Sequence, residues 1–275
     1  MAFVLLFIRF FVLLQVKKDG FMKIAILQHD IAWLNTGKNL QHLEEMMRGE
    51  DYADLYVLPE MFSTGFCTQP QEVAEDAFEG QTLKWMKRMS TVTDAAIAGS
   101  VAVKEGDRFF NRLYFVRPDG KVNWYDKRHL FQYGGEDRWF TNGTKRIVTD
   151  FRGMRFLLQT CFDLRFPVWS RFQEDYDTIL YVANWPLKRN LAWNTLLRAR
   201  AIENQCFVVG ANRVGHDPQC EYVGESAIIH PYGHELAACP FGQESIKMAE
   251  LDLEALYTFR KKFPMEKEEC FKNTN

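Results

Sequence analysis

The stretch MRFLLQTCFDLRFP, residues 154–167, joins an apolar run to a cysteine at the position where that run stops. Residues 154–160 have the composition of a β-strand, and Cys161 is followed at once by a segment rich in charge. Because α/β proteins place their chemistry at the carboxyl ends of strands, this arrangement is typical of a strand that presents a nucleophile. A free cysteine is more often a small buried hydrophobe, so Cys161 alone leaves both interpretations open.

Strands and helices alternate on both sides of this stretch. Short apolar runs predict strands at 23–28, 53–58, 96–103, 178–183, 206–211 and 245–251. Apolar residues at helical spacing predict helices at 36–48, 81–94 and 191–205, and another after Pro167. Turn residues predict hairpins over 111–126 and 225–239. The mixture of βα units and antiparallel hairpins favours a layered α/β domain with mixed sheets over a regular Rossmann alternation.

The overall composition is that of an ordinary globular protein. The chain has 275 residues, of which 47% are hydrophobic and 25% charged, and its net charge of -2 gives no electrostatic reason to expect a nucleic-acid partner. The six cysteines form no C-x-x-C pair, so we expect reduced thiols in a cytoplasmic setting. His230 and His234 flank a turn instead of sharing a helix face, and no metal is expected.

The first 21 residues differ from all that follow. Residues 2–16 are strongly apolar, are interrupted by Arg9, and are too short for a membrane-spanning helix. They also lack the leading positive charge and the small residues of a secretory signal. We favour an extension ahead of a start at Met22, with membrane association as the alternative. The expected organisation is therefore an apolar extension over 1–21 and a single domain over 22–275.

Two further strand ends carry groups that can assist a thiol. Glu60 follows the apolar run 53–58 and precedes aromatic residues, so its carboxylate should be partly desolvated and suited to proton transfer. Lys127 ends the second strand of the hairpin over 111–126. Taken singly, a solvated loop glutamate and a solvated hairpin lysine are the commoner interpretations. The combination of all three groups in one chain is what favours catalysis.

Three strand-end motifs in this order, LPEMFSTGF (58–66), YDKRHLF (125–131) and QTCFDLRFP (159–167), resemble the nitrilase or carbon–nitrogen hydrolase superfamily. The likeness runs from about Met22 to about Pro264. It implies Glu60 as general base, Lys127 as the cation beside the tetrahedral intermediate and Cys161 as nucleophile. It also implies that Glu136 is the second glutamate often found near such a site. The implied fold is a four-layer αββα sandwich that pairs through its outer helices into homodimers or larger assemblies.

Within that superfamily the chain most resembles the omega-amidases, which release ammonia from 2-oxoacid amides such as 2-oxoglutaramate. The residues that carry this likeness are 161–167, Asn184-Trp185-Pro186, Arg189, Trp193, 199–204, 212–215 and 222–226. The likeness implies a small-molecule amide and water as partners and no cofactor. It departs from many relatives at Phe162, which replaces a tyrosine, although the useful group there is the backbone N–H.

The expected chemistry is attack of Cys161 on a carboxamide through a thioester. Lys127 would favour the thiolate and Glu60 would take the proton, while Lys127 and the Phe162 N–H would hold the oxyanion. Arg165 could bind a distal carboxylate, or it could form an internal ion pair with Asp163 or another acidic residue. Trp185 and Phe66 are expected to wall the pocket, or else to be plain core.

Three other functions remain open at this point. A different carbon–nitrogen hydrolase activity would act on aliphatic amides, N-carbamoyl compounds or nitriles. A Cys–His pair would use His129 as the base in place of Glu60. A non-catalytic member of the fold would only bind its ligand, although intact Glu60, Lys127 and Cys161 argue against that.

Overall fold

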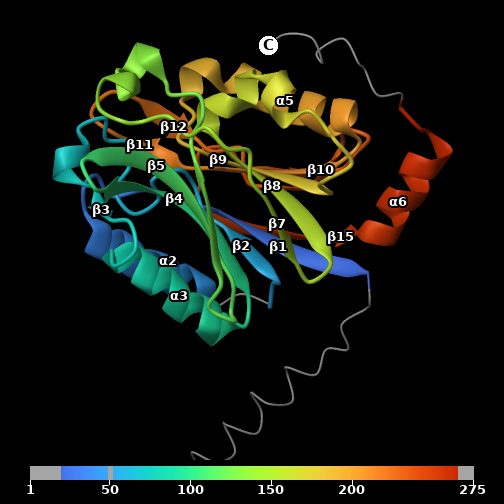
Figure 1. Ribbon diagram of the computed structural model, residues 1–275, viewed down its shortest axis with the longest axis horizontal. Coiled ribbons are helices and arrows are strands. Elements are labelled where there is room, and N and C mark those ends of the chain that lie inside the picture. Colours follow the sequence, from blue (N-terminus) through green and yellow to red (C-terminus); the bar gives the residue numbers. More distant parts are fainter. Residues whose placement is uncertain (1–19, 49–51, 266–275) are drawn as a thin grey trace, which may run out of the picture.

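The computed structural model describes residues 20–48 and 52–265, in which two β-sheets lie face to face (Figure 1). The strands of the first sheet follow the order β15 (Ser245–Asp252), β1 (Phe21–Gln28), β2 (Leu55–Val57), β4 (Ala96–Glu105), β5 (Arg108–Val116) and β6 (Val122–Asp126), with β3 (Glu75–Asp76) beside β4. Those of the second follow β14 (Glu235–Ala238), β13 (Ala227–Ile229), β10 (Phe207–Asn212), β9 (Thr178–Ala183), β8 (Met154–Thr160) and β7 (Val148–Phe151). A short hairpin joins β11 (Val214–His216) to β12 (Glu221–Val223).

Each sheet is mixed, with parallel strands at its centre. β2 pairs in parallel with β1 and β4, and β9 pairs in parallel with β8 and β10, whereas the outer pairs are antiparallel. Parallel strands need both faces covered, which explains why the runs at 24–27, 55–58 and 179–183 are apolar without alternation. The carboxyl ends of β2, β8 and β9 lead into the site described below.

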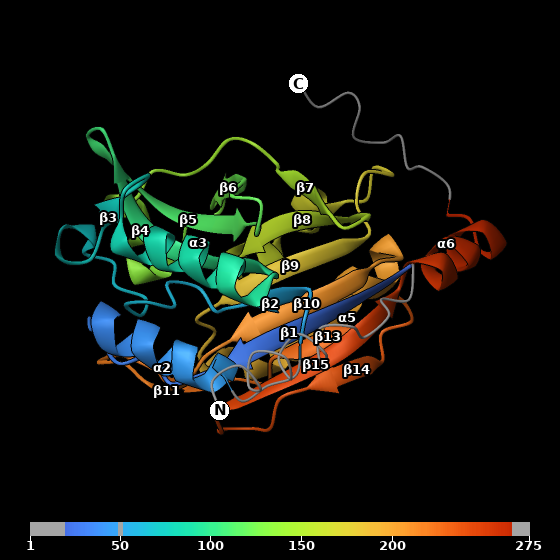
Figure 2. The ribbon, with the colours of Figure 1, turned by 90° about the horizontal axis from the view of Figure 1, so that it is seen from below.

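Helices cover the outer face of each sheet (Figures 1 and 2). α2 (Thr36–Arg48) and α3 (Gln81–Thr93) pack on the first sheet through residues such as Leu43 and Met86. α5 (Asn190–Asn204) packs on the second sheet through Trp193 and Leu197. One apolar core fills the space between the two sheets, with contributions from both. The four layers are thus helix, sheet, sheet and helix, and the predicted αββα sandwich is confirmed.

Most predicted elements occur within two residues of their expected bounds, and the differences have local causes. The helix predicted after Pro167 is the single turn α4 (Pro167–Ser170). α6 (Leu253–Lys262), which was not predicted, begins where the Asp252 side chain accepts a hydrogen bond from the Ala255 N–H at 2.8 Å. The hairpin of β11 and β12 was also missed, because its strands have only three residues each and carry little apolar pattern.

The apolar residues 2–16 lie outside the described residues, so the expectations about them stay predictions. The first strand begins at Phe21, and its Met22 is buried opposite Leu251 of β15. In the part of the chain that the structure describes, no helix has the length and apolar character needed to cross a membrane.

Candidate active site

Four strand ends meet at one end of the sandwich. Glu60 lies three residues after β2, and Lys127 directly follows β6, both in the first sheet. Cys161 directly follows β8, and Asn184 directly follows β9, both in the second sheet. The site therefore forms where the two sheets approach each other, and each polar group is fixed by the strand that precedes it.

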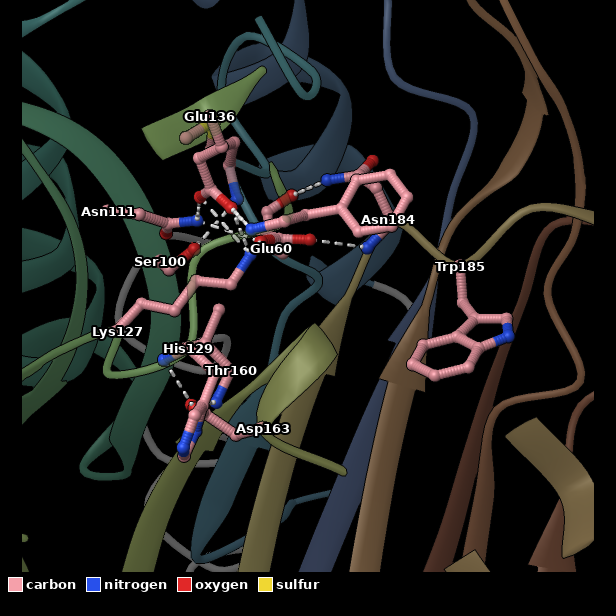
Figure 3. Close-up of polar contacts among 12 residues, drawn as sticks. Glu60, Ser100, Asn111, Lys127, His129, Glu136, Thr160, Asp163, Asn184 and Trp185 are labelled. Carbon is pink, nitrogen blue, oxygen red and sulfur yellow. Dashed lines mark hydrogen bonds and ion pairs between the residues drawn. The ribbon is translucent and has the colours of Figure 1, made fainter. Parts of the chain in front are cut away.

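The Glu60, Lys127 and Glu136 side chains form a closed charged cluster (Figure 3). The Lys127 Nζ donates to Glu60 Oε1 at 2.8 Å and to Glu136 Oε2 at 2.9 Å, and all three side chains are fully buried. Glu136 also accepts the Phe131 N–H at 2.6 Å. It reaches the cluster from a 3₁₀ turn (Glu136–Arg138), so the ammonium is held by carboxylates from two separate segments of the chain. Glu136 thus contacts the lysine ammonium directly and is itself held by the backbone of Phe131.

Charges within the cluster control the protonation of its members. Burial acts to lower the pKa of Lys127, but the carboxylates of Glu136 and Glu60 outweigh it and raise that pKa above its ordinary value. Burial raises the pKa of Glu136, an effect that Lys127 opposes and Glu60 reinforces. The lysine is consequently an ammonium at neutral pH, held between two acidic groups.

Glu60 is held on every side. Its Oε1 accepts hydrogen bonds from Lys127 and, at 2.7 Å, from the Asn111 amide, while its Oε2 accepts the Asn184 backbone N–H at 2.9 Å. The Asn184 side chain in turn donates to the Glu60 carbonyl. The next residue, Met61, has a positive φ of 42° and donates its N–H to the Ser100 hydroxyl at 2.9 Å. This sharp turn directs the Glu60 carboxylate into the cavity instead of along the strand.

Cys161 stands at a strained turn at the mouth of the cluster. Its φ is +46°, a region that non-glycine residues enter at a cost, and it starts the 3₁₀ turn η4 (Cys161–Arg165). The Phe162 N–H lies in the first turn of η4, where N–H groups have no acceptor within the helix. That N–H is a suitable donor for an oxyanion formed at the sulfur.

The surroundings of Cys161 favour its neutral form. Burial and the neighbouring Glu60 carboxylate raise the pKa of the Cys161 thiol well above its ordinary value, and Lys127 opposes them. Two carboxylates and one ammonium leave a net negative charge beside the sulfur, so a thiolate is disfavoured at rest. Lys127 alone would lower the pKa of this thiol, but burial and Glu60 outweigh it, with a smaller contribution from Glu136.

A cavity of about 190 Å³ opens above the sulfur. Its walls include Glu60, Cys161 and all four residues predicted to contact substrate, which are Phe66, Phe162, Arg165 and Trp185. Lys127 and Glu136 are not among its lining residues. The Lys127 ammonium lies behind the wall, 5.3 Å from the centre of the Phe66 ring. The Lys127 ammonium therefore acts on a bound substrate mainly through its positive charge and through its hydrogen bond to Glu60, because it does not line the cavity.

Two arginines face the same cavity from different elements. The Arg165 guanidinium stacks over the Trp185 ring at 5.2 Å, and the Arg189 guanidinium stacks over the Phe131 ring at 4.9 Å. Neither forms an ion pair with any acidic side chain of residues 20–48 and 52–265, and Asp163 is occupied elsewhere. The alternative of an Arg165–Asp163 ion pair is thus wrong. Guanidiniums that lie over aromatic rings and form no ion pair among these residues can receive a carboxylate.

His129 contacts Asp163 (Figure 3) and does not line the cavity that Cys161 lines. Its Nδ1 is 2.7 Å from Asp163 Oδ1, and its ring stacks on Phe166 with centroids 3.7 Å apart. Asp163 also accepts the Tyr125 hydroxyl at 2.8 Å and the Thr160 N–H at 2.9 Å. Asp163 therefore links the end of the strand before Cys161 to the segment after Lys127 through hydrogen bonds. His129 takes part in these structural contacts and does not contact the thiol.

Sequence reasoning assigned no role to three residues of the site, although Asn184 and Arg189 were among those that carry the family likeness. Asn111 contacts both carboxylates, Asn184 holds Glu60, and Arg189 lines the cavity. Asn184 had a usable signal, because it follows a buried strand as Glu60 and Cys161 do. Asn111 had none, since it lies within a strand. In the described part of the chain, no three His, Cys, Asp or Glu side chains are arranged to hold a metal ion.

Comparisons with known proteins identify the family of this chain and its relatives. The family model described as carbon–nitrogen hydrolase matches residues 23–261. The omega-amidase YafV of Yersinia enterocolitica is 46% identical over 245 residues, which cover 88% of this chain and 94% of that protein. A 2-oxoglutaramate amidase of Bacillus subtilis is 34% identical over 88% of this chain and 95% of that protein.

Solved structures agree with the sequence relatives. XC1258 of Xanthomonas campestris, described as a CN-hydrolase superfamily protein with an arsenic adduct in the active site, superposes with a TM-score of 0.85. It is 38% identical, over 89% of this chain and 95% of that chain. Nit3 of Saccharomyces cerevisiae has a TM-score of 0.82 at 24% identity over 92% of this chain and 97% of that chain, and so is similar in fold.

Proposed function

The chain belongs to the carbon–nitrogen hydrolase family, and we propose that it is an amidase that releases ammonia from the omega-amide of a small 2-oxo dicarboxylic acid, such as 2-oxoglutaramate. The observation that carries the proposal is the buried Glu60–Lys127–Glu136 cluster beside a cavity-lining cysteine. Relatives named omega-amidase and 2-oxoglutaramate amidase, at 34% to 46% identity over most of both chains, support the same substrate class.

Acylation begins with a neutral thiol and an ionised Glu60. As the Cys161 sulfur attacks the amide carbon, its proton passes to Glu60 and the carbonyl oxygen becomes an oxyanion. The Phe162 N–H donates to that oxyanion, and the Lys127 ammonium stabilises its charge from behind Phe66. The raised pKa of Cys161 is compatible with this step, because the proton moves during attack and not before it.

The remaining steps return every group to its starting state. Protonated Glu60 gives its proton to the amide nitrogen, the C–N bond breaks, and ammonia leaves behind a thioester on Cys161. Water then adds to the thioester carbon while Glu60 takes one of its protons. The C–S bond breaks and the sulfur recovers that proton from Glu60. The product leaves as a carboxylic acid, which gives its remaining proton to solvent and becomes the second carboxylate. Lys127 keeps its proton throughout, as its raised pKa requires.

The two cavity arginines support an acidic substrate. A dicarboxylic monoamide places a carboxylate a few bonds away from its amide, and Arg165 and Arg189 face the cavity without an acidic partner among the residues that the structure describes. A hydrogen bond to a charged group contributes about 1.5–3 kcal/mol. We therefore expect Arg165→Met and Arg189→Met each to lower kcat/KM for such a monoamide by about 10- to 10²-fold.

The arginine variants are compared on an uncharged amide, for which their kcat/KM should fall by much less. Arg88→Met is the matched control, because Arg88 pairs with Glu44 on the outer helices away from the cavity. Steady-state ammonia release measures all three variants. An equal loss on charged and uncharged amides would contradict a carboxylate-binding role.

The competing functions fit the site less well. A Cys161–His129 pair lacks support, because His129 does not line the cavity and its Nδ1 is engaged by Asp163. A protein that only binds its ligand would not need an ammonium buried between two carboxylates at a nucleophile. An uncharged amide or nitrile would use the same nucleophile, but it would leave Arg165 and Arg189 without an anionic group to bind.

A substrate panel on purified protein tests the proposal. We expect ammonia from 2-oxoglutaramate, much less from simple aliphatic amides and nitriles, and none from Cys161→Ala. Cys239→Ala, which removes a thiol from the core between the sheets, should keep wild-type activity. Ammonia from nitriles or N-carbamoyl compounds, with the oxoacid amide untouched, would overturn the substrate class.

A further inference from the structure

Asn111 is a buried asparagine on β5 that touches every charged member of the cluster. Its backbone carbonyl accepts the Lys127 N–H at 3.0 Å, so it fixes the chain at the point where the lysine leaves β6. Its side chain is fully buried and projects to the two glutamates (Figure 3). The residue is thus tied to Lys127 through its backbone and to the carboxylates through its amide.

The Asn111 amide bridges the two carboxylates. Its Nδ2 donates to Glu60 Oε1 at 2.7 Å and to Glu136 Oε1 at 3.0 Å, the same two oxygens that lie within 3.2 Å of the Lys127 Nζ. Two donors therefore hold the carboxylates together, one charged and one neutral. When the ammonium is drawn towards a developing oxyanion, the neutral donor still screens Glu60 from Glu136.

The orientation of the amide is fixed by charge. Asn111 Oδ1 is buried and has no hydrogen-bond partner among the described residues. Turning the amide over would bring this oxygen against two carboxylate oxygens and would lose both hydrogen bonds. Leaving the buried Oδ1 without a partner costs free energy. The two hydrogen bonds to Glu60 and Glu136 outweigh that cost and so fix the orientation of the amide.

A neutral donor suits this position better than a charged one. The cluster already holds two carboxylates and one ammonium, and a third carboxylate would add repulsion, whereas a second ammonium would neutralise the base. Asparagine supplies two N–H groups without altering the charge. We propose that Asn111 is a positioning residue, resting on the amidase function above, whose neutral amide keeps Glu60 beside Cys161 as a free base while Lys127 serves the oxyanion.

Two substitutions separate positioning from a purely structural role. Asn111→Ala removes the bridge and adds no titratable group, so kcat should fall by about 10- to 10²-fold at every pH while KM changes little.

The second variant, Asn111→Asp, has nearly the same shape as the wild type. Its carboxylate repels the glutamates, but its protonated form donates one O–H in place of the amide N–H. The activity of Asn111→Asp should therefore recover as the pH falls. As the pH rises, its activity should begin to decline at a lower pH than that of the wild type.

Asn204→Asp is the matched control, because Asn204 is also buried and hydrogen-bonded but lies at the end of α5. Its pH profile should follow the wild type. Melting temperatures measured on all variants identify loss of fold. A wild-type kcat in Asn111→Ala, or a pH profile of Asn111→Asp that superimposes on the wild type, would overturn the inference.

A readout independent of substrate keeps the inference separate from the proposed function. Iodoacetamide alkylates Cys161 with loss of iodide, and the rate reports how readily the thiol gives up its proton. We expect slower alkylation of Asn111→Asp than of wild type at pH 8, with the ratio approaching one as the pH falls. If no amide is hydrolysed by wild type, the proposed function fails while this ratio still tests Asn111. Equal rates at every pH would refute the role of Asn111.

Discussion

At the scale of single residues, the site depends on an ammonium placed between two carboxylates. Lys127 is buried and forms ion pairs to Glu60 and Glu136 at 2.8 and 2.9 Å. A buried ion pair does little for net stability, but removing one partner leaves uncompensated charge and costs about 3–5 kcal/mol. The cluster is therefore arranged for proton transfer, and its stability is sensitive to any change of charge.

Lys127→Met should both abolish turnover and destabilise the fold in a pH-dependent way. A lysine with a raised folded-state pKa contributes stability that is complete below its unfolded value near 10.5 and is lost at higher pH. Without it, the pKa of Glu136 rises further, since Lys127 lowers it more than the hydrogen bonds from Phe131 and Asn111 do. The variant then gains stability as the pH falls, because the folded state binds a proton more tightly than the unfolded state.

Melting temperatures of wild type and Lys127→Met, measured from pH 8 down to pH 5.5, check this prediction. The difference between the two should be largest at pH 8 and should shrink steadily towards pH 5.5. A melting-temperature difference that stays constant, or that grows as the pH falls, would show that Lys127 does not stabilise the fold by compensating the charges of Glu60 and Glu136.

Glu136→Gln should separate positioning from proton transfer. Glu136 does not line the cavity, so the substitution should lower kcat by about 10- to 10²-fold through a displaced Lys127 and leave KM nearly unchanged. Glu60→Gln removes the base itself and should cost about 10²–10⁴-fold. Single-turnover ammonia release on both variants gives the comparison, and equal losses would contradict separate roles.

At the scale of elements, the loop after β6 is what brings lysine and second glutamate together. Gly143 donates its N–H to the Lys127 carbonyl at 2.8 Å, and a Cβ at Gly143 would lie 2.0 Å from the Asp126 carbonyl oxygen. Backbone atoms must move to accept any side chain there. This glycine therefore allows the close approach that fixes the loop between residues 127 and 143.

Gly143→Ala should lower kcat at least tenfold and lower the melting temperature by several degrees, because the end of β6 must shift. Gly37→Ala in α2 is the matched control. Its Cβ would meet open space, and alanine in a helix should stabilise by about 0.5–1 kcal/mol. Circular dichroism melts and initial rates measure both. A folded Gly143→Ala with wild-type kcat would show that this contact does not position Lys127.

The elements also show which parts of the molecule were accessible from sequence. Glu60, Lys127 and Cys161 were predicted because each follows an apolar run, and a strand end is a local signal. Asn111 was missed because it lies within β5, opposite Ala102. Only the register of neighbouring strands brings its amide to Glu60 and Glu136, and register is not encoded in any short stretch. The same limit hid the effect of Glu136 on the Cys161 thiol.

At the scale of the whole molecule, apolar side chains gather on one outer face. Ile202 on α5, Tyr232 in the turn before β14 and Phe263 after α6 are 52%, 64% and 63% exposed. The patch is continuous, since Gly233 approaches the Ile202 side chain and Phe259 lies between Tyr232 and Phe263. An exposed patch of this kind marks an association surface. We therefore expect it to pair with a second copy of the chain.

Sedimentation velocity on wild type and Tyr232→Asp checks this pairing. We expect a dimer or larger assembly for wild type and a shift towards monomer for the variant. Val92→Asp, which alters an exposed apolar residue on α3 away from the patch, should sediment like the wild type. A wild-type chain that is monomeric at tens of micromolar would contradict the expectation.

The central claim is that the Cys161 sulfur, which follows a strand of one sheet, attacks the amide carbon while Glu60, which follows a strand of the other sheet, acts as the base. Rapid acid quench during turnover of 2-oxoglutaramate, followed by peptide mass mapping, tests it most directly. We predict an adduct with the mass of the substrate less ammonia on the peptide that contains Cys161, and no adduct in Cys161→Ala. Steady ammonia release with that peptide always unmodified, or with the acyl group on a different side chain, would contradict the claim.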